Sequence, residues 1–336
     1  MKILLTGGLG YIGSHTAVEL LNHHHEVIIV DNLANSSLSV LDRLKKITHQ
    51  EIPFYQIDVA NKVELEPVFL HHTFDAIIHF AGLKAVGESV AKPLEYYQNN
   101  VLATLNLASF SIKYGVHKFV FSSSATVYGD QPSPLIETME LKTTTNPYGE
   151  TKAMSERILT DAAKANPPFS VSLLRYFNPI GAHESALIGE NPNGIPNNLM
   201  PYITKVAKGE LKELQIYGQD YPTIDGTGIR DYIHVVDLAK GHIAALNKMK
   251  SAVNIYNLGT GKGVSVLELV TAFQNVNHVR VPYKVVGRRP GDLAIVYADP
   301  GKAKRELGWE TSKTIEDMCR DAWNFEKQNV RKHTDR

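Results

Sequence analysis

The chain opens on the stretch Ile3-Leu4-Leu5-Thr6-Gly7-Gly8-Leu9-Gly10-Tyr11-Ile12-Gly13. A short apolar run, typical of a buried strand, leads here into glycines spaced by three residues. Glycine permits a tight turn and lets the backbone approach a pyrophosphate, and a helix that starts there offers its amide groups to the anion. The stretch therefore predicts the strand, turn and helix of a dinucleotide-binding βαβ unit.

A second apolar run, residues 27–30, ends at Asp31, about 20 residues beyond the glycines. In a dinucleotide-binding unit, a carboxylate at this place binds the adenosine ribose hydroxyls and repels a 2′-phosphate. The sequence therefore favours NAD over NADP. A purely structural turn followed by a strand-end Asp is the alternative interpretation.

Further strand-like runs at residues 76–80 and 119–122 alternate with segments of helical length. This alternation predicts an α/β protein with a Rossmann-like, doubly wound parallel sheet. After Tyr176 the chain becomes rich in Gly, Pro and Asn, which suits a smaller α/β substrate-binding domain. We expect a sheet domain of residues 1–176 with 232–258 returning to it, a substrate domain of 177–231 and 259–330, and a tail of 331–336.

Composition limits the partners that we expect. The 336 residues carry 35 basic and 35 acidic side chains, so neither a nucleic acid nor a membrane surface is expected. The one cysteine, Cys319, cannot form an intrachain disulfide, which suits a reducing compartment and predicts a cytoplasmic protein. The contiguous histidines at 23–25 and 71–72 diverge around a helix or turn, so no metal site is expected.

The segment that begins at Pro93 has the spacing of a helix. Its apolar residues Tyr97, Val101, Leu105 and Ala108 recur every three or four positions, so we expect them to share one apolar face of a helix, which suits packing on the core.

The strongest chemical signal is the stretch Asn146-Pro147-Tyr148-Gly149-Glu150-Thr151-Lys152. Asn146 is a good N-cap and Pro147 suits the first helical position, so Tyr148 and Lys152 should lie one turn apart on the same helix face. The phenol has an ordinary pKa of about 10, and we expect the ammonium and the helix N-terminus to lower this pKa. Ser124, just beyond strand 119–122, would hydrogen-bond the reacting oxygen. The alternative is an ordinary surface Tyr and Lys.

The glycine turn, Ser124 and the Tyr-x-x-x-Lys pair, in this order, are a more specific signal than any one of them. On these residues the chain resembles the extended short-chain dehydrogenase/reductases, and within them the UDP-glucose 4-epimerases. The resemblance covers almost the whole chain, from the opening glycines to Gly308-Trp309, and is carried by five further stretches: Asp31-Asn32-Leu33, Ser122–Gly129, Arg175–Pro179, Pro196–Tyr202 and Gly226–His234.

The resemblance implies a catalytic trio of Ser124, Tyr148 and Lys152, NAD as cofactor, a UDP-hexose as substrate and a homodimer. Including the residues already singled out, the cofactor-binding residues are Gly7, Gly10, Tyr11, Ile12, Gly13, Asp31, Asn32, Asn35, Ser36, Asp58, Val59, Phe80, Ala81, Gly82, Lys84, Asn99, Ser122, Tyr148, Lys152 and Tyr176. The substrate-binding residues are Lys84, Ser124, Tyr148, Phe177, Asn178, Asn198, Leu199, Tyr217, Arg230, Tyr232, Arg289, Asp292 and Val296. Arg230 and Arg289 suit a diphosphate, because guanidinium forks match phosphate oxygens.

The implied reaction interconverts UDP-glucose and UDP-galactose by inversion at carbon 4 through a transient 4-keto sugar. Related dehydratases need an acid pair beside the strand-end threonine, but Ala125 and Val127 flank Thr126 here, which argues against dehydration. Val296, at a position beside the sugar, is moderate in size, so we expect some tolerance for UDP-N-acetylhexosamines. The alternatives are another nucleotide-sugar epimerase such as a UDP-uronate 4-epimerase, a nucleotide-sugar reductase, or a non-catalytic sensor of NAD or nucleotide sugars.

Overall fold

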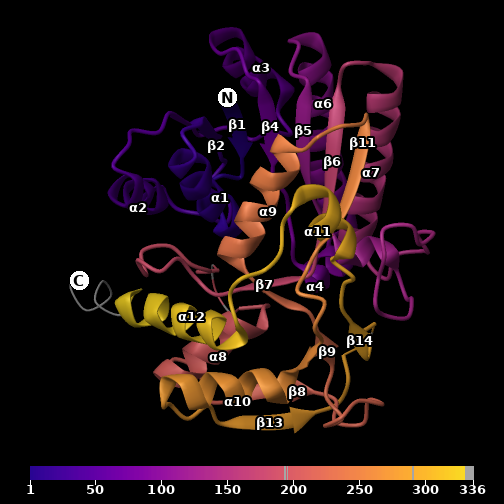
Figure 1. Ribbon diagram of the computed structural model, residues 1–336. Helices are drawn as coiled ribbons and strands as arrows, with labels where there is room; N and C mark the ends of the chain where they lie inside the picture. Colours follow the sequence, from indigo (N-terminus) through magenta and orange to yellow (C-terminus); the bar gives the residue numbers. More distant parts are fainter. Residues whose placement is uncertain (193, 195, 290, 330–336) are drawn as a thin grey trace.

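The computed structural model describes residues 1–192, 194, 196–289 and 291–329, so the predicted tail lies outside the described residues. Within them, seven strands form one parallel sheet (Figure 1). Their order across the sheet is β3 (Phe54–Tyr55), β2 (Glu26–Val30), β1 (Lys2–Thr6), β4 (Ala76–His79), β5 (Lys118–Ser124), β6 (Ser170–Tyr176) and β11 (Val253–Leu258). The doubly wound fold class is confirmed, and the strand order reverses between β1 and β4, where such sheets bind ligands.

Each face of this sheet packs against its own layer of helices (Figure 1). Ile3 and Leu5 of β1 belong to one apolar core and Leu4 to the other, because successive side chains of a strand point to opposite faces. The first core is covered by α1 (Tyr11–Asn22), α2 (Leu38–Thr48) and α9 (Val235–Asn247), and the second by α3 (Lys62–His71), α6 (Leu102–Lys113) and α7 (Pro147–Ala165). No helix in the described part of the chain is long and apolar enough to cross a bilayer.

The helix expected from Pro93 is interrupted by a π turn. It consists of α5 (Pro93–Tyr96), a π-helical segment Tyr97–Val101 and α6, and it follows the short α4 (Val86–Ala91). The predicted core face is partly wrong: Ala108 is buried, but Leu105 is exposed, and the core contacts come from Tyr96 and Leu107 instead. A π turn holds more residues than an α turn, so side chains beyond it are rotated relative to those before it.

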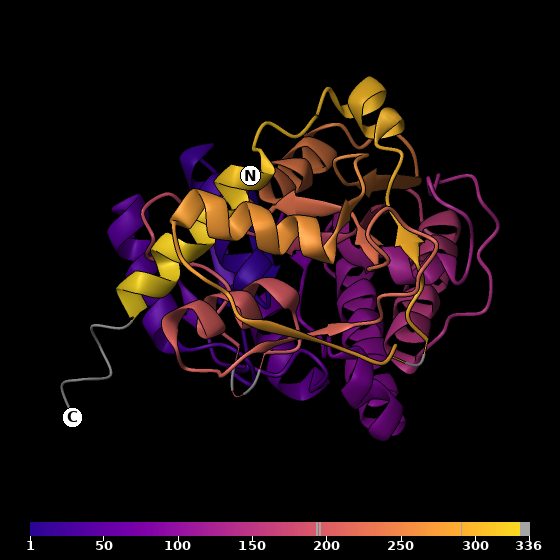
Figure 2. The ribbon, with the colours of Figure 1, turned by 90° about the horizontal axis from the view of Figure 1, so that it is seen from below.

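A smaller lobe lies beyond the carboxyl ends of the main strands (Figure 1). It contains short paired strands: β7 (Asn178–Ile180) with β10 (Tyr232–His234), β8 (Leu214–Tyr217) with β13 (Tyr283–Val286), and β9 (Ile229–Arg230) with β12 (Val264–Ser265) and β14 (Ile295–Val296). Its helices are α8 (Leu199–Lys208), α10 (Val266–Asn277) and α12 (Ile315–Asn329). Figure 2 shows α10 and α12 side by side, and their apolar faces share one core with β8.

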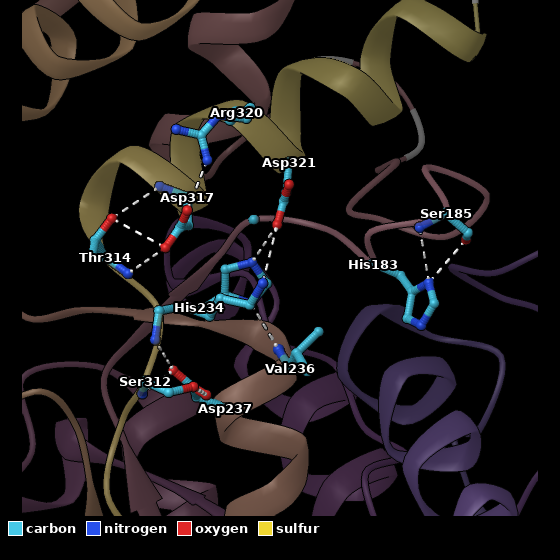
Figure 3. Close-up of polar contacts among 12 residues, drawn as sticks. His183, Ser185, His234, Val236, Asp237, Ser312, Thr314, Asp317, Arg320 and Asp321 are labelled. Carbon is cyan, nitrogen blue, oxygen red and sulfur yellow. Dashed lines mark hydrogen bonds and ion pairs between the residues drawn. The ribbon is translucent and has the colours of Figure 1, made fainter.

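Polar contacts at the start of α9 fasten the last part of the chain to the sheet domain (Figure 3). Asp237 accepts hydrogen bonds from both the amide and the hydroxyl of Ser312, each at 2.8 Å. His234 is the N-cap of α9, and its Nδ1 accepts from the Val236 amide at 3.1 Å. Its Nε2 therefore carries the hydrogen and donates to Asp321 of α12 at 3.2 Å. These bonds join the smaller lobe to a helix that packs on the main sheet.

Residues 301–309 pack against the main sheet, although they belong to the substrate domain in the predicted division. Ala303 and Leu307 of α11 (Gly301–Leu307) are buried with Trp309 in the core shared by α9 and β11. The Trp309 indole donates to the Asp237 carbonyl oxygen at 2.9 Å. The return of residues 253–258 to the sheet follows the prediction, while the boundaries between the two domains stay a prediction.

Candidate functional site

At the glycine turn, the end of β1, the start of α1 and the segment after β4 lie closer together than side chains would allow. Gly7 has a φ of +69°, and a Cβ there would lie 2.6 Å from the Ala81 amide nitrogen. A Cβ on Gly13 would lie 2.2 Å from the Gly7 carbonyl oxygen. Helix α1 then begins after Gly10 without a side-chain cap, which leaves its first-turn amides for an anion.

The carboxylate of Asp31 is fixed at the end of β2 by local donors. Its Oδ2 accepts from the Leu9 amide at 3.1 Å, and its Oδ1 accepts from the Leu33 amide at 2.9 Å and the Ser36 hydroxyl at 2.8 Å. An ionised carboxylate has about four acceptor sites, so capacity remains for the hydroxyls of a ribose. Asp31 lines the cleft that starts at the glycine turn.

This cleft runs from the glycine turn and the ends of β2 and β4 to the start of α7. Every residue that the sequence assigned to the cofactor lines it. Of the predicted substrate residues, only Lys84 and Tyr148 line it. The cleft therefore gathers the predicted cofactor set, and most of the predicted substrate set lies beyond it.

The predicted catalytic side chains lie together where β5 meets α7. The Asn146 side chain accepts from the Gly149 amide at 2.9 Å and Pro147 opens the helix, as predicted. The Ser124 hydroxyl, at the end of β5, accepts from the Thr126 amide at 3.2 Å and acts on the Tyr148 phenol, whose pKa it lowers. The Lys152 Nζ lies 5.9 Å from the centre of the Tyr148 ring.

The titration of these groups differs from the expectation. Burial raises the pKa of Tyr148 to about 12, and the hydrogen bond with Ser124 offsets only part of this rise. Burial lowers the pKa of Lys152 to about 8, opposed by the negative charge of Glu156. The expected lowering of the Tyr148 pKa is therefore wrong, because the loss of hydration outweighs the other effects. A raised pKa disfavours the phenolate at pH 7, and a positive charge near Tyr148 favours it.

The predicted substrate residues form separate groups in the smaller lobe. Arg230 lies 3.5 Å from Asp292 and pairs with Val296 in the register of β9 and β14. Tyr232 and Asn178 pair in the register of β10 and β7. In another group, the Arg289 guanidinium lies 3.9 Å from the centre of the Tyr217 ring.

The remaining predicted substrate residues lie near the turn after Ser124 and at the start of α8. Phe177 shares an apolar cluster with Val296, next to Ala125 of the turn after Ser124. Asn198 occupies the N-cap position of α8 without a side-chain capping bond, and Leu199 begins the helix.

Several lining residues were not predicted, among them Arg43, Glu190 and Phe325. The Glu190 Oε1 accepts from the Lys84 Nζ at 3.0 Å and from the Asn198 Nδ2 at 2.5 Å. Glu190 thus joins a predicted cofactor residue to a predicted substrate residue. A single acidic residue in a segment rich in Gly, Pro and Asn has no pattern that indicates such a role, and its position depends on packing between the two lobes.

Comparison with known proteins places the chain in a family. Residues 3–259 match the NAD dependent epimerase/dehydratase family. The chain is 57% identical over 333 residues to the UDP-glucose 4-epimerase of Bacillus subtilis (strain 168), covering 98% of each chain. It is also similar to the crystal structure of UDP-glucose 4-epimerase from Bifidobacterium longum in complex with NAD+ and UDP, with a TM-score of 0.95, 52% identity, and coverage of 98% of this chain and 99% of that one. This chain belongs to the NAD dependent epimerase/dehydratase family.

Proposed function

We propose that the protein interconverts UDP-glucose and UDP-galactose by inverting carbon 4 of the hexose, with NAD held throughout. The meeting of Ser124, Tyr148 and Lys152 beside the cleft carries this proposal. It is supported by a relative named UDP-glucose 4-epimerase at 57% identity over nearly the full length, and by a similar structure that contains NAD+ and UDP.

The cleft suits NAD at the glycine turn and at Asp31. The turn at Gly7 and Gly13 has no room for a Cβ, and the uncapped start of α1 offers amides to a pyrophosphate. The Asp31 carboxylate suits ribose hydroxyls and repels a 2′-phosphate. When bound, NAD supplies the hydride acceptor, then the donor, and the positive charge of its nicotinamide.

The reacting groups of the chain handle the proton and the oxygen. The hydrogen on carbon 4 is too weakly acidic for a side chain to remove as a proton, so inversion requires a transient ketone. Tyr148 takes the proton of the carbon-4 hydroxyl as the ketone forms and returns it after the sugar has turned over. Ser124 hydrogen-bonds the reacting oxygen, and the Lys152 ammonium favours the phenolate.

In this proposal the predicted site residues keep their roles. The cofactor set binds NAD along the cleft, and the residues of the smaller lobe bind the UDP-hexose. Arg230 and Arg289 take the diphosphate, which a guanidinium pair suits. The sheet domain of residues 1–176 and 232–258 carries the cofactor and adds Lys84, Ser124, Tyr148 and Tyr232 to the substrate site, and the smaller lobe carries the other substrate residues. A cytoplasmic location is part of the proposal, since the lone Cys319 suits a reducing compartment, and cell fractionation checks it.

Conversion of UDP-galactose tests the proposal directly. The purified protein should convert UDP-galactose to UDP-glucose without net consumption of NAD, measured by a coupled UDP-glucose dehydrogenase. A reductase would instead consume reduced nicotinamide in proportion to product. If UDP-glucose does not form even with added NAD, the function is wrong, and UDP-uronates are the next substrates to assay.

Replacing Tyr148 separates catalysis from sensing. Tyr148→Phe should lower kcat by roughly 100-fold to 10,000-fold, because the proton acceptor is lost, while bound NAD is retained. Nucleotide released on denaturation measures that retention. An unchanged kcat in Tyr148→Phe would contradict the assigned role of Tyr148. A wild-type protein that binds NAD but turns over no nucleotide sugar would favour a sensor.

The lowered pKa of Lys152 predicts a pH limit. A pKa of about 8 means that the ammonium is present below pH 8 and is lost as the pH rises through that value. Since the ammonium favours the phenolate of Tyr148, kcat should fall above about pH 8. Steady-state rates between pH 6 and pH 10 measure this, and a kcat that stays level up to pH 10 would contradict it.

The size of Val296 predicts substrate tolerance. This side chain is partly buried beside Phe177, and on the proposed function its moderate size leaves room for some bulk at carbon 2 of the sugar. We expect the wild type to convert UDP-N-acetylgalactosamine, and Val296→Tyr to lose this activity by roughly tenfold or more while keeping UDP-galactose turnover. Absence of any wild-type turnover of the N-acetylated substrates would refute this expectation.

We propose a homodimer formed by α6 and α7. Leu102, Leu105 and Ile112 of α6 and Met154 of α7 are exposed, and such an apolar surface is typical of an interface. Light scattering should give twice the chain mass for the wild type and a shift toward the single chain for Leu105→Glu. Leu70→Glu, at an exposed position on α3, is the matched control and should keep the wild-type mass. A monomeric wild type would contradict the proposal.

A further inference from the structure

A buried ion pair lies directly behind the reacting groups. The Glu156 carboxylate on α7 accepts two hydrogen bonds from the Arg175 guanidinium on β6, at 2.9 Å from Nε and 2.6 Å from the second nitrogen. Each of the two residues is only 3% exposed. A buried pair of this kind is costly to desolvate and is weak evidence of stabilisation, so another role is worth seeking.

The pair belongs to a set of contacts between α7 and the end of β5. Glu156 lies one helical turn beyond Lys152, which itself lies one turn beyond Tyr148. The Ser123 hydroxyl donates to Glu156 Oε1 at 2.5 Å, and the Lys152 Nζ donates to the Ser122 carbonyl oxygen at 2.6 Å. The Ser124 side chain acts on the Tyr148 phenol and lowers its pKa. Two successive residues of β5, Ser122 and Ser123, are therefore held by side chains one turn apart on α7, and Ser124 follows them beside Tyr148, one turn earlier on the same helix.

Arg175 extends this set into the sheet. Its guanidinium lies 4.8 Å from the centre of the buried Tyr128 ring, in the short 3-10 turn that follows Ser124. The Tyr128 hydroxyl donates to the Asn257 Oδ1 of β11 at 2.7 Å. The residues before and after Ser124 are therefore both tied to the ion pair.

We propose that Glu156, paired with Arg175, is a positioning residue of the catalytic centre that fixes the β5 end carrying Ser124 and sets the charge balance around Lys152. This inference rests on the proposed function and adds to it a role for groups that do not touch the reacting atoms.

The charged and titratable groups around Lys152 support the proposed role of Glu156 in the charge balance. On its own helix Lys152 faces Tyr148 and Glu156, and from β4 it faces His79. Burial and Lys152 lower the pKa of His79 to about 3, so His79 is neutral at pH 7. From β6, the Tyr176 phenol, whose pKa burial raises, is bonded to Ser122. Glu156 is therefore the negative group acting on Lys152, and Arg175 balances it.

Three variants test the charge balance by the pH dependence of kcat. Glu156→Gln leaves Arg175 unpaired, so the alkaline limb should move to lower pH by about one unit or more. Arg175→Met leaves Glu156 unpaired, so the limb should move to higher pH. The double variant removes both charges and should return the limb close to the wild-type position.

The matched control is Glu326→Gln. Glu326 is also a buried carboxylate, 2.9 Å from Lys208, but it lies in the smaller lobe away from Lys152. Its substitution should lower stability without moving the pH limb. Limbs in Glu156→Gln and Arg175→Met that stay at the wild-type position would overturn the inference, as would shifts of the same sign in both.

Ser123→Ala tests whether Glu156 positions the end of β5. It keeps the proposal testable if the variants of Glu156 and Arg175 do not fold. It removes the contact between Glu156 and β5 and leaves both charges in place. We expect kcat to fall about tenfold with the KM for UDP-galactose and the pH limb unchanged. An unchanged kcat would refute the positioning role. A wild type that does not convert UDP-galactose would refute the proposed function instead, so the two failures are distinguishable.

Discussion

The parallel register of the main sheet is the constraint on which the site depends. Because the strands run in one direction, their carboxyl ends meet at one edge. Thr6 of β1 pairs with His79 of β4, and Ser124 of β5 pairs with Tyr176 of β6. The glycine turn, Ser124 and Tyr176 thereby reach the same edge of the sheet from segments far apart in the chain. Backbone hydrogen bonds between neighbouring strands bring these segments together.

Burial of Tyr148 and Lys152 at this edge has two opposite effects on proton transfer. An apolar surrounding strengthens electrostatic interactions, but it disfavours the ionised forms of Tyr148 and Lys152. The site therefore holds a phenol of raised pKa next to an ammonium of lowered pKa. On the proposed function, the Gly7 turn and Asp31 would hold NAD in the cleft, and the positive charge that NAD would supply there would favour the phenolate of Tyr148.

The sequence predicts the parts of the site that are set by local rules. The glycine turn, the Asn146 cap and the Tyr148–Lys152 spacing depend on a few neighbouring residues, and the structure has them as expected. The π turn at Tyr97–Val101 was not predicted, because a helical pattern assumes a constant number of residues per turn. Glu190 and Arg175 were not predicted as site residues, because their contacts come from segments far away in the sequence. Glu190 contacts Lys84, and Arg175 of β6 contacts Glu156 of α7.

The substrate end depends on a different kind of anchor. Asp231, fully buried between Arg230 and Tyr232, accepts hydrogen bonds from the amides of Thr260 at 2.8 Å and Ala298 at 3.1 Å. It ties the end of β9, which carries Arg230, to the residues that follow β11 and β14, so a diphosphate held by Arg230 would be held rigidly. Val296 and Phe177 offer only apolar surface, which forms no directional bonds with a sugar. On the proposed function, a firmly held diphosphate and a weakly held hexose are what a 4-keto sugar needs in order to present its opposite face.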